Sequence, residues 1–263
     1  MDNDRKRELL KGLVTGLCVE RGCEQPDSED VDELWTAFRA LVNTRPPIPA
    51  SDEWLAMQDE LLRGIIAEAG ISTVDDAAPS PADQRLRLWR GDITTLEADA
   101  IVNAANSQML GCWVPGHHCI DNAIHTFAGV QLRAECARIM EAQGHEEPTG
   151  AAKITGAYNL PSKHVIHTVG PIANGRPTDL HRGQLASCYR RCLDLAAENG
   201  LRSIAFCCIS TGVFGFPQHE ATQIAVQTVR EWLEASESDM TVIFNVFGRK
   251  DEQLYRTALD MER

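Results

Sequence analysis

Two cysteines and two histidines lie close together in the stretch GCWVPGHHCIDN, residues 111–122. Cys112, His117 and Cys119 follow the spacing C-x4-H-x-C, which is short enough for one loop to surround a tetrahedral ion. Thiolate and imidazole are the ligands that zinc prefers. Since no second Cys/His pair of this kind occurs elsewhere in the chain, the spacing predicts three protein ligands and one open position, which is typical of catalytic zinc.

Two alternatives remain open at this stage. His118 competes with His117 for the middle position, and adjacent residues rarely both reach one ion, so spacing alone does not choose between them. The loop could also hold two buried thiols and two surface histidines without a metal. The clustering of four soft ligands within eight positions favours a metal site.

Asp121 and Asn122 follow the loop directly, at the start of a predicted helix. An aspartate there is very often only an N-cap. Asp121, however, comes two residues after Cys119, and a carboxylate beside the open position of a zinc ion could orient or deprotonate a water molecule. We therefore expect Asp121 to take part in chemistry.

Three further segments carry polar groups or glycines at positions where a ligand could bind. The stretch STGVFGFP (210–217) precedes a predicted helix, and its backbone amides could hold an anion, although it lacks the lysine of a Walker loop. In NAAN (103–106), Asn103 and Asn106 could bind sugar hydroxyls or simply form a turn. Asp92 could accept from an adenine amino group or cap a local turn.

The other histidines and cysteines receive structural interpretations. His125, His164 and His167 are expected to find hydrogen-bond partners locally, one on a helix and two on a strand. Seven cysteines outside the loop are expected to be small buried hydrophobic side chains, namely Cys18, Cys23, Cys136, Cys188, Cys192, Cys207 and Cys208.

Composition excludes several classes of function. The chain has 263 residues, 43% of them hydrophobic, and a formal net charge of −13 without a basic stripe, so double-stranded DNA and RNA are poor partners. No apolar run approaches the length of a membrane span, and the start MDNDRKRELL lacks the apolar segment of a secretion signal. These features predict a cytoplasmic protein whose nine cysteines are mostly reduced.

The pattern of apolar residues predicts a helical N-terminal extension over residues 1–78 and an α/β domain over 79–263. Ser28 and Ser51 are candidate N-caps, and the polar stretch 75–84 is a connector. Strands are predicted at 85–88, 100–105, 164–170, 203–210 and 240–248, and helices at 120–140, 180–199, 219–235 and from 251. This alternation favours βαβ units, in which ligands bind beyond the carboxyl ends of the strands.

Taken together, GDIT, DAIVNAAN, NAIHTFAG and STGVFGFP resemble the macrodomain family, which binds ADP-ribose, in order and approximate spacing over about residues 85–260. The replacement of a glycine run by GCWVPGHHC, together with the N-terminal extension carrying NTRPPIP, resembles the zinc-dependent hydrolase branch of that family. Trp113 stands where this branch has phenylalanine. The resemblance implies a three-layer α/β/α fold with a central mixed sheet behind the helical extension.

The resemblance also implies roles for individual residues. Asp92 and Ile93 would recognise adenine, and Phe247 would stack on it. Asn103 and Asn106 would lie near the distal ribose, Asn122 would also bind the ligand, and Asp121 and Asn106 would be catalytic residues. The diphosphate would bind the loop made by Ser210, Thr211, Gly212, Val213 and Phe214. Zn²⁺ would be held by Cys112, His117 and Cys119, because the family pattern favours His117 over His118.

The implied reaction is hydrolysis of the bond between the distal ribose and a protein side chain, a carboxylate ester, with release of mono-ADP-ribose. The implied partner is a mono-ADP-ribosylated protein such as a lipoylated carrier, and a monomer is the default assembly. Two alternatives are a non-catalytic ADP-ribose reader with a structural zinc and a phosphohydrolase of ADP-ribose 1″-phosphate. The N-terminal helices, with their PPIP segment, could dock the protein substrate.

Overall fold

The N-terminal helices form a small core of their own in the computed structural model, which describes residues 1–261. Helices α1 (Asn3–Arg21), α2 (Val31–Asn43) and α3 (Asp52–Ala69) bury apolar side chains such as Leu13, Phe38 and Leu62 against one another. Ser51 caps α3, as predicted, by accepting from the amide of Trp54. Ser28 is not an N-cap, because Asp30 accepts from the amides at the start of α2.

A seven-stranded mixed sheet forms the centre of the molecule, in the order β2-β3-β9-β8-β5-β7-β6. Strands β3, β9, β8, β5 and β7 run parallel to one another, whereas β2 and β6 are antiparallel edge strands. A separate short pair joins β1 to β4. The strands are β1 (Ser72–Thr73), β2 (Ala78–Pro79), β3 (Leu86–Arg90), β4 (Leu96–Glu97), β5 (Ala100–Ala105), β6 (Ala152–Gly156), β7 (His164–Val169), β8 (Ser203–Phe206) and β9 (Thr241–Val246).

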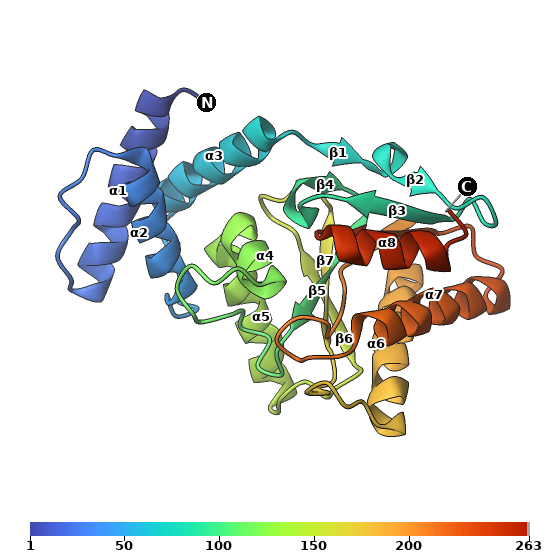
Figure 1. Cartoon of the computed structure of the whole chain (residues 1–263). Helices are drawn as coiled ribbons and strands as arrows, with labels where there is room; N and C mark the ends of the chain where they lie inside the picture. Colours follow the sequence, from blue (N-terminus) through green and yellow to red (C-terminus); the bar gives the residue numbers. More distant parts are fainter. Residues whose placement is uncertain (262–263) are drawn as a thin grey trace.

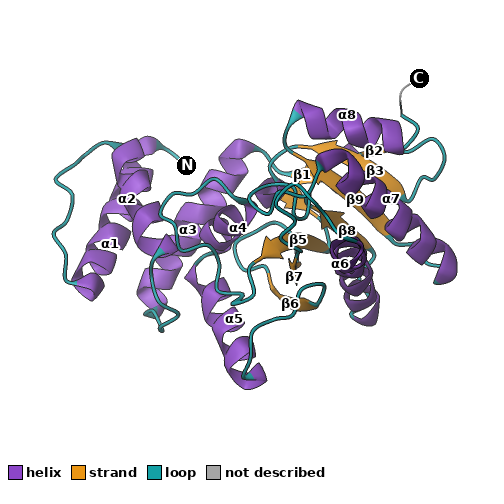
Figure 2. Cartoon of the chain, turned by 60° about the horizontal axis from the view of Figure 1, so that its bottom comes forward, coloured by secondary structure: helices purple, strands orange, loops and turns teal. Residues whose placement is uncertain are grey.

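Helices cover both faces of the sheet, which gives the predicted three-layer α/β/α architecture (Figure 1). α4 (Ile120–Ala128) and α5 (Val130–Gln143) lie on one side, next to the N-terminal helices. α6 (Asp179–Glu198), α7 (Gln218–Ala235) and α8 (Arg249–Ala258) lie on the other side (Figure 2). Short 3-10 turns η1 (Val74–Asp76) and η2 (Ile93–Thr95) complete the elements.

Three features differ from the sequence predictions. The helix predicted over 120–140 is two helices, because Gly129 adopts φ +97° between α4 and α5. Edge strand β6 was not predicted; it alternates polar and apolar residues over only five positions. The stretch 75–84 is not only a connector, since β2 within it pairs with β3. The predicted boundary at residue 78 stays a prediction.

The core lies between the sheet and its two helical layers, where strands β5, β7, β8 and β9 are buried almost throughout. Because the parallel strands share one direction, the segments that follow them meet at one edge of the sheet. All predicted site residues lie at or just beyond this carboxyl edge or at the start of α4. Among residues 1–261, no helix has both the length and the apolar character needed to cross a membrane.

Candidate active site

The loop between β5 and α4 brings together the three predicted metal ligands. The ligand atoms of Cys112, His117 and Cys119 all lie within 4.8 Å of one another, and Cys112 Sγ is 3.5 Å from His117 Nδ1. All three side chains are half-buried. His118 is exposed and lies outside this group, so the choice that the spacing left open falls on His117.

The surroundings of Cys119 disfavour the negative charge of its thiolate. Burial, with the neighbouring Cys112, raises the pKa of Cys119 to about 11. A thiolate in such a place requires a cation beside it. The donor set therefore fits a soft divalent metal such as zinc.

Asp121 lies beside the metal-ligand group and is 5% exposed. Its Oδ1 accepts from Asn103 Nδ2 at 2.8 Å, and its Oδ2 accepts from Asn106 Nδ2 at 3.4 Å. Burial raises the pKa of Asp121 to about 6, although the Asn103 hydrogen bond opposes this shift. Asp121 is not the N-cap of α4, because Cys119 holds that position and its Sγ accepts from the amide of Asn122.

A buried polar chain continues behind Asn103. His167 Nδ1 is 3.1 Å from Asn103 Nδ2, and His167 Nε2 is 3.0 Å from Thr155 Oγ1. Because the amide nitrogen can only donate, His167 accepts through Nδ1 and carries its proton on Nε2. Burial lowers the pKa of His167 to about 3, so the ring is neutral and holds Asn103 in place.

His125 does not fit its sequence interpretation. Neither ring nitrogen has a hydrogen-bond partner within residues 1–261, although the ring is buried. Its Nε2 lies 3.6 Å from Asp121 Oδ1, one helical turn along α4. Burial, with His167 nearby, keeps the pKa of His125 well below its usual value. The prediction that His125 forms a local hydrogen bond is therefore wrong. His164 does have such a partner, the backbone carbonyl of Thr155.

The remaining amide side chains of the loop are largely occupied. Asn106 Nδ2 also donates to the carbonyl of Gly111, and its Oδ1 accepts from the amide of Gln108. Asn122 is buried; its Oδ1 accepts from Arg39 and its Nδ2 donates to the carbonyl of Val114. These bonds shape the loop. Ribose binding by Asn103 and Asn106 and ligand binding by Asn122 stay predictions.

The loop after β8 has the form expected of an anion site. Ser210 adopts φ +65°, and the amide of Phe216 returns to its carbonyl, so the chain closes a tight loop. The amides of Gly212, Val213 and Phe214 have no hydrogen-bond partner in the part of the chain that the structure describes. Val213 is 78% exposed at the tip. Free amides on an exposed loop can hold a diphosphate without a cationic side chain.

The predicted adenine residues lie just beyond the carboxyl ends of the adjacent strands β3 and β9. The carboxylate of Asp92 accepts from the amide and hydroxyl of Thr94, so it caps η2, which was the alternative interpretation. Ile93 is buried, whereas Phe247 is 81% exposed at the end of β9. Because Phe247 and Asp92 are both exposed and follow adjacent strands, both are accessible to a ligand at this edge.

The other cysteines and the proline-rich segment complete the comparison with the sequence. All nine cysteines are free thiols; Cys23 is exposed and Cys208 half-buried, so the prediction of burial was wrong for Cys23.

Pro47, Ile48 and Pro49 border a groove of about 490 Å³ against α5. Docking of a protein substrate there stays a prediction.

The comparisons with known proteins identify the family. The model of the Macro domain family matches residues 102–225. A protein-ADP-ribose hydrolase of Treponema medium is 56% identical over 96% of this chain and 97% of its own length. One from Staphylococcus aureus (strain MRSA252) is 51% identical over 88% of this chain and 86% of its own length. The chain belongs to the macrodomain family.

Solved structures agree with this assignment. The Trypanosoma brucei macrodomain in complex with ADP-ribose has a TM-score of 0.65 and 33% identity, covering 84% of this chain and 94% of its own. The Oceanobacillus iheyensis macrodomain with ADP has a TM-score of 0.61 and 42% identity, covering 67% of this chain and 90% of its own. These similarities confirm the three-layer macrodomain fold predicted from the sequence.

Proposed function

We propose that this chain is a zinc-dependent hydrolase that removes mono-ADP-ribose from protein side chains by cleaving a carboxylate ester. The observation that carries the proposal is the group of Cys112, His117 and Cys119 beside the buried carboxylate of Asp121 at the carboxyl edge of a macrodomain sheet. The similarity to protein-ADP-ribose hydrolases over nearly the whole chain supports the same reaction class.

The donor set fits zinc in chemistry and in spacing. Zinc bonds of about 2.3 Å to sulfur and about 2.0–2.1 Å to nitrogen in tetrahedral geometry place the two donors about 3.5 Å apart. Cys112 Sγ and His117 Nδ1 are 3.5 Å apart. Within residues 1–261 the group contains three donor side chains, which leaves a fourth position for a water molecule or the substrate.

Asp121 and Asn106 have separate roles beside the metal. When bound, zinc would supply Lewis-acid chemistry, either activating a water molecule or polarising a ribose oxygen. Asp121, held by Asn103 and Asn106, accepts or returns a proton at its carboxylate. Asn106 also donates to the carbonyl of Gly111, the residue before Cys112, and so joins the carboxylate of Asp121 to the start of the metal loop.

The rest of the ligand binds at a distance from the reacting bond. The amides of Gly212 to Phe214 hold the diphosphate, and Ser210 and Thr211 shape that loop. Asp92, Ile93 and Phe247 receive the adenine. Because the whole chain carries a formal charge of −13, the dianionic ligand must be bound by these local amide dipoles. A lipoylated carrier as substrate, the monomeric state and the cytoplasmic location remain predictions.

The test measures metal content and turnover on the same preparation. We expect one zinc ion per chain by elemental analysis, and release of ADP-ribose from a protein modified on glutamate. Chelation and Cys112→Ser should abolish release and leave ADP-ribose binding in place. Cys23→Ser, which alters an exposed thiol far along the sequence, serves as the matched control.

Each alternative has its own outcome. Full activity after complete metal removal would refute the zinc dependence. Binding of ADP-ribose by the zinc-loaded protein without any turnover would assign it as a reader. Release of phosphate from ADP-ribose 1″-phosphate, with none of ADP-ribose from modified protein, would assign it as a phosphohydrolase.

A further inference from the structure

The carboxyl end of α2 contacts the metal-binding loop directly. Asn43, the last residue of α2, is 1% exposed. Its Oδ1 accepts from the amide of Gly116 at 2.9 Å, and its Nδ2 donates to Thr126 Oγ1 on α4 at 2.9 Å. One side chain of the N-terminal extension therefore links the middle of the loop to the helix that carries Asp121.

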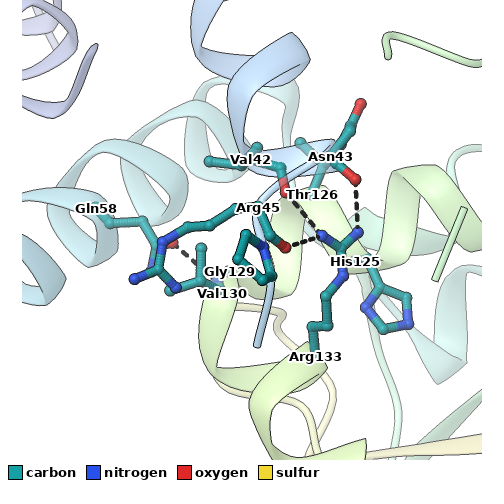
Figure 3. Close-up of a pocket in the computed structure, with 10 residues that line it drawn as sticks. Val42, Asn43, Arg45, Gln58, His125, Thr126, Gly129, Val130 and Arg133 are labelled. Atoms are coloured by element: carbon teal, nitrogen blue, oxygen red, sulfur yellow. Dashed lines mark hydrogen bonds between the residues drawn. The ribbon is translucent and has the colours of Figure 1, made fainter. Parts of the chain in front are cut away.

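Arg133, on α5, makes a second connection between the end of α2 and the metal-binding loop. Its buried guanidinium points into the end of α2 and donates to the carbonyls of Val42, Asn43 and Arg45 at 3.0, 2.9 and 2.6 Å (Figure 3). Its Nε donates to the carbonyl of Leu110, just before the loop, at 2.7 Å. The unpaired carbonyls at a helix carboxyl end carry partial negative charge, which a cation satisfies.

The same guanidinium packs on the loop itself. It lies 4.3 Å from the centre of the Trp113 ring, next to the ligand Cys112. A third contact comes from Arg39 on α2, whose Nη2 is 2.9 Å from Asn122 Oδ1 and 3.4 Å from the carbonyl of His117. The extension thus contacts the loop at Gly116 and His117 and the residue Asn122 after it, while Arg133 of α5 joins the end of α2 to Leu110 and Trp113.

The loop has little structure of its own to hold it. Within residues 111–119, one backbone hydrogen bond closes a turn, from the amide of His117 to the carbonyl of Val114. Trp113, Val114 and Pro115 are exposed. Ordering such a segment costs conformational entropy, and contacts outside the loop must offset that cost.

We propose that the end of α2 is a positioning element for the metal site, with Asn43 and Arg39 of α2 and Arg133 of α5, which binds the end of α2, as positioning residues for the zinc ligands. This inference rests on the proposed function and adds a role for the extension beyond substrate docking. Side chains that orient the ligands of a metal often change its affinity 10- to 100-fold when they are removed. Through these contacts, the N-terminal extension would influence how tightly the loop binds zinc.

The experiment compares two breaks in the contact between extension and core. Asn43→Ala removes the bonds to Gly116 and Thr126, whereas Asn43→Asp keeps an acceptor for the amide of Gly116. The matched control is Asp59→Ala, since Asp59 on α3 accepts from Gln131 at 3.0 Å and from Asn159 at 2.7 Å, away from the loop. Arg39→Ala is a second loop-side variant in case Asn43→Ala does not fold.

Three measurements are made on full-length protein: amide exchange over 111–119 without metal, zinc affinity by chelator competition, and thermal unfolding. Asn43→Ala and Arg39→Ala should speed loop exchange and weaken zinc binding about tenfold or more. Asn43→Asp should stay within about threefold of the parent, because its acceptor is retained. Asp59→Ala should lower the melting temperature without either change.

Equal exchange rates and zinc affinities in Asn43→Ala and Asp59→Ala would overturn the inference. So would normal zinc affinity in Arg39→Ala combined with unchanged loop exchange. If the parent protein binds no zinc, the proposed function fails, while amide exchange in the metal-free protein still decides whether α2 holds the loop.

Discussion

The two halves of the candidate site are built in different ways. The half proposed to bind adenine and diphosphate consists of loops after β3, β8 and β9, which offer free backbone amides and one exposed ring. The proposed metal half combines the half-buried ligand group with a buried network in which Asp121 is hydrogen-bonded to Asn103 and Asn103 to His167, and α2 contacts its loop. Exposed loops can bind, but only the buried half can exclude water and hold a proton-transferring group at a fixed place.

Removing the carboxylate of the metal half should have the largest effect. Asp121→Asn keeps the shape of the side chain and loses its capacity to accept a proton, so we expect ADP-ribose release to fall by about a thousandfold. Binding of ADP-ribose should change by less than about threefold, since the exposed half is intact. Isothermal titration and a single-turnover assay measure the two quantities. A parallel loss of binding would contradict the division of labour between the halves.

Removing one amide of the exposed half should weaken binding more than turnover. Val213→Pro deletes the free amide at the loop tip, and the loss of one hydrogen bond to a charged group corresponds to about ten- to one-hundredfold in ADP-ribose affinity. Val213→Ala keeps the amide and is the control. Titration with ADP-ribose checks the affinity, and saturating substrate should restore the rate. If the rate stays low at saturating substrate, the loop after β8 contributes to turnover as well as to binding, which contradicts the proposed division between the two halves.

Phe247→Ala tests the stacking surface on the same half. Loss of base stacking is worth about 1–3 kcal/mol, so affinity for ADP-ribose should fall about tenfold. Phe247→Tyr should retain it. Because Phe247 is 81% exposed, the melting temperature should not change. Titration with ribose 5-phosphate, which has no base, should show no difference between the variants; a difference there would remove the adenine assignment.

The smallest effect is expected at Asp99, at the amino end of β5 and away from both halves of the site. Burial alone would raise the pKa of Asp99, but the Lys163 ammonium and the amides of Arg202 and Ser203 lower it below its usual value. Asp99 therefore stabilises the fold above its unfolded pKa of about 3.9, and this stabilisation is lost as the pH falls through the folded value.

Asp99→Asn should lower the free energy of unfolding by about 1 kcal/mol at pH 7. The difference from the parent should shrink as the pH falls below 4, because the parent carboxylate is then protonated too. Urea unfolding at several pH values measures this trend, and ADP-ribose affinity at pH 7 should be unchanged. A difference that is constant with pH would assign the effect to packing rather than to charge.

The metal half shows the limit of what local pattern can reveal. The spacing of Cys112, His117 and Cys119 is visible in the sequence because one short loop carries all three. Asn43 lies 73 residues from its partner Gly116, and Arg133 lies 91 residues from Val42, so no local pattern predicts either contact. The only signal for Arg133 was an arginine within an otherwise amphipathic helix, which is common on helix surfaces.

The histidines illustrate the same limit. His125 and His167 look alike in the sequence, each beside apolar residues in a predicted element. His167 finds partners on a neighbouring strand, whereas His125 faces Asp121 without a close partner. Whether a buried ring has a hydrogen-bond partner depends on the elements packed against it. Those elements lie far away in the sequence, so local pattern does not predict them.

The sequence by itself predicted the alternation of strands and helices, the edge at which the candidate site lies, and a loop whose two cysteines and adjacent histidine pair could bind a metal. These follow from side-chain periodicity and from spacing within single segments, which are local properties. The tertiary structure decided that His117 and not His118 joins the donors, and that Asn103, His167 and α2 support them. Such contacts join residues far apart along the chain, so they exist only once packing has brought the segments together.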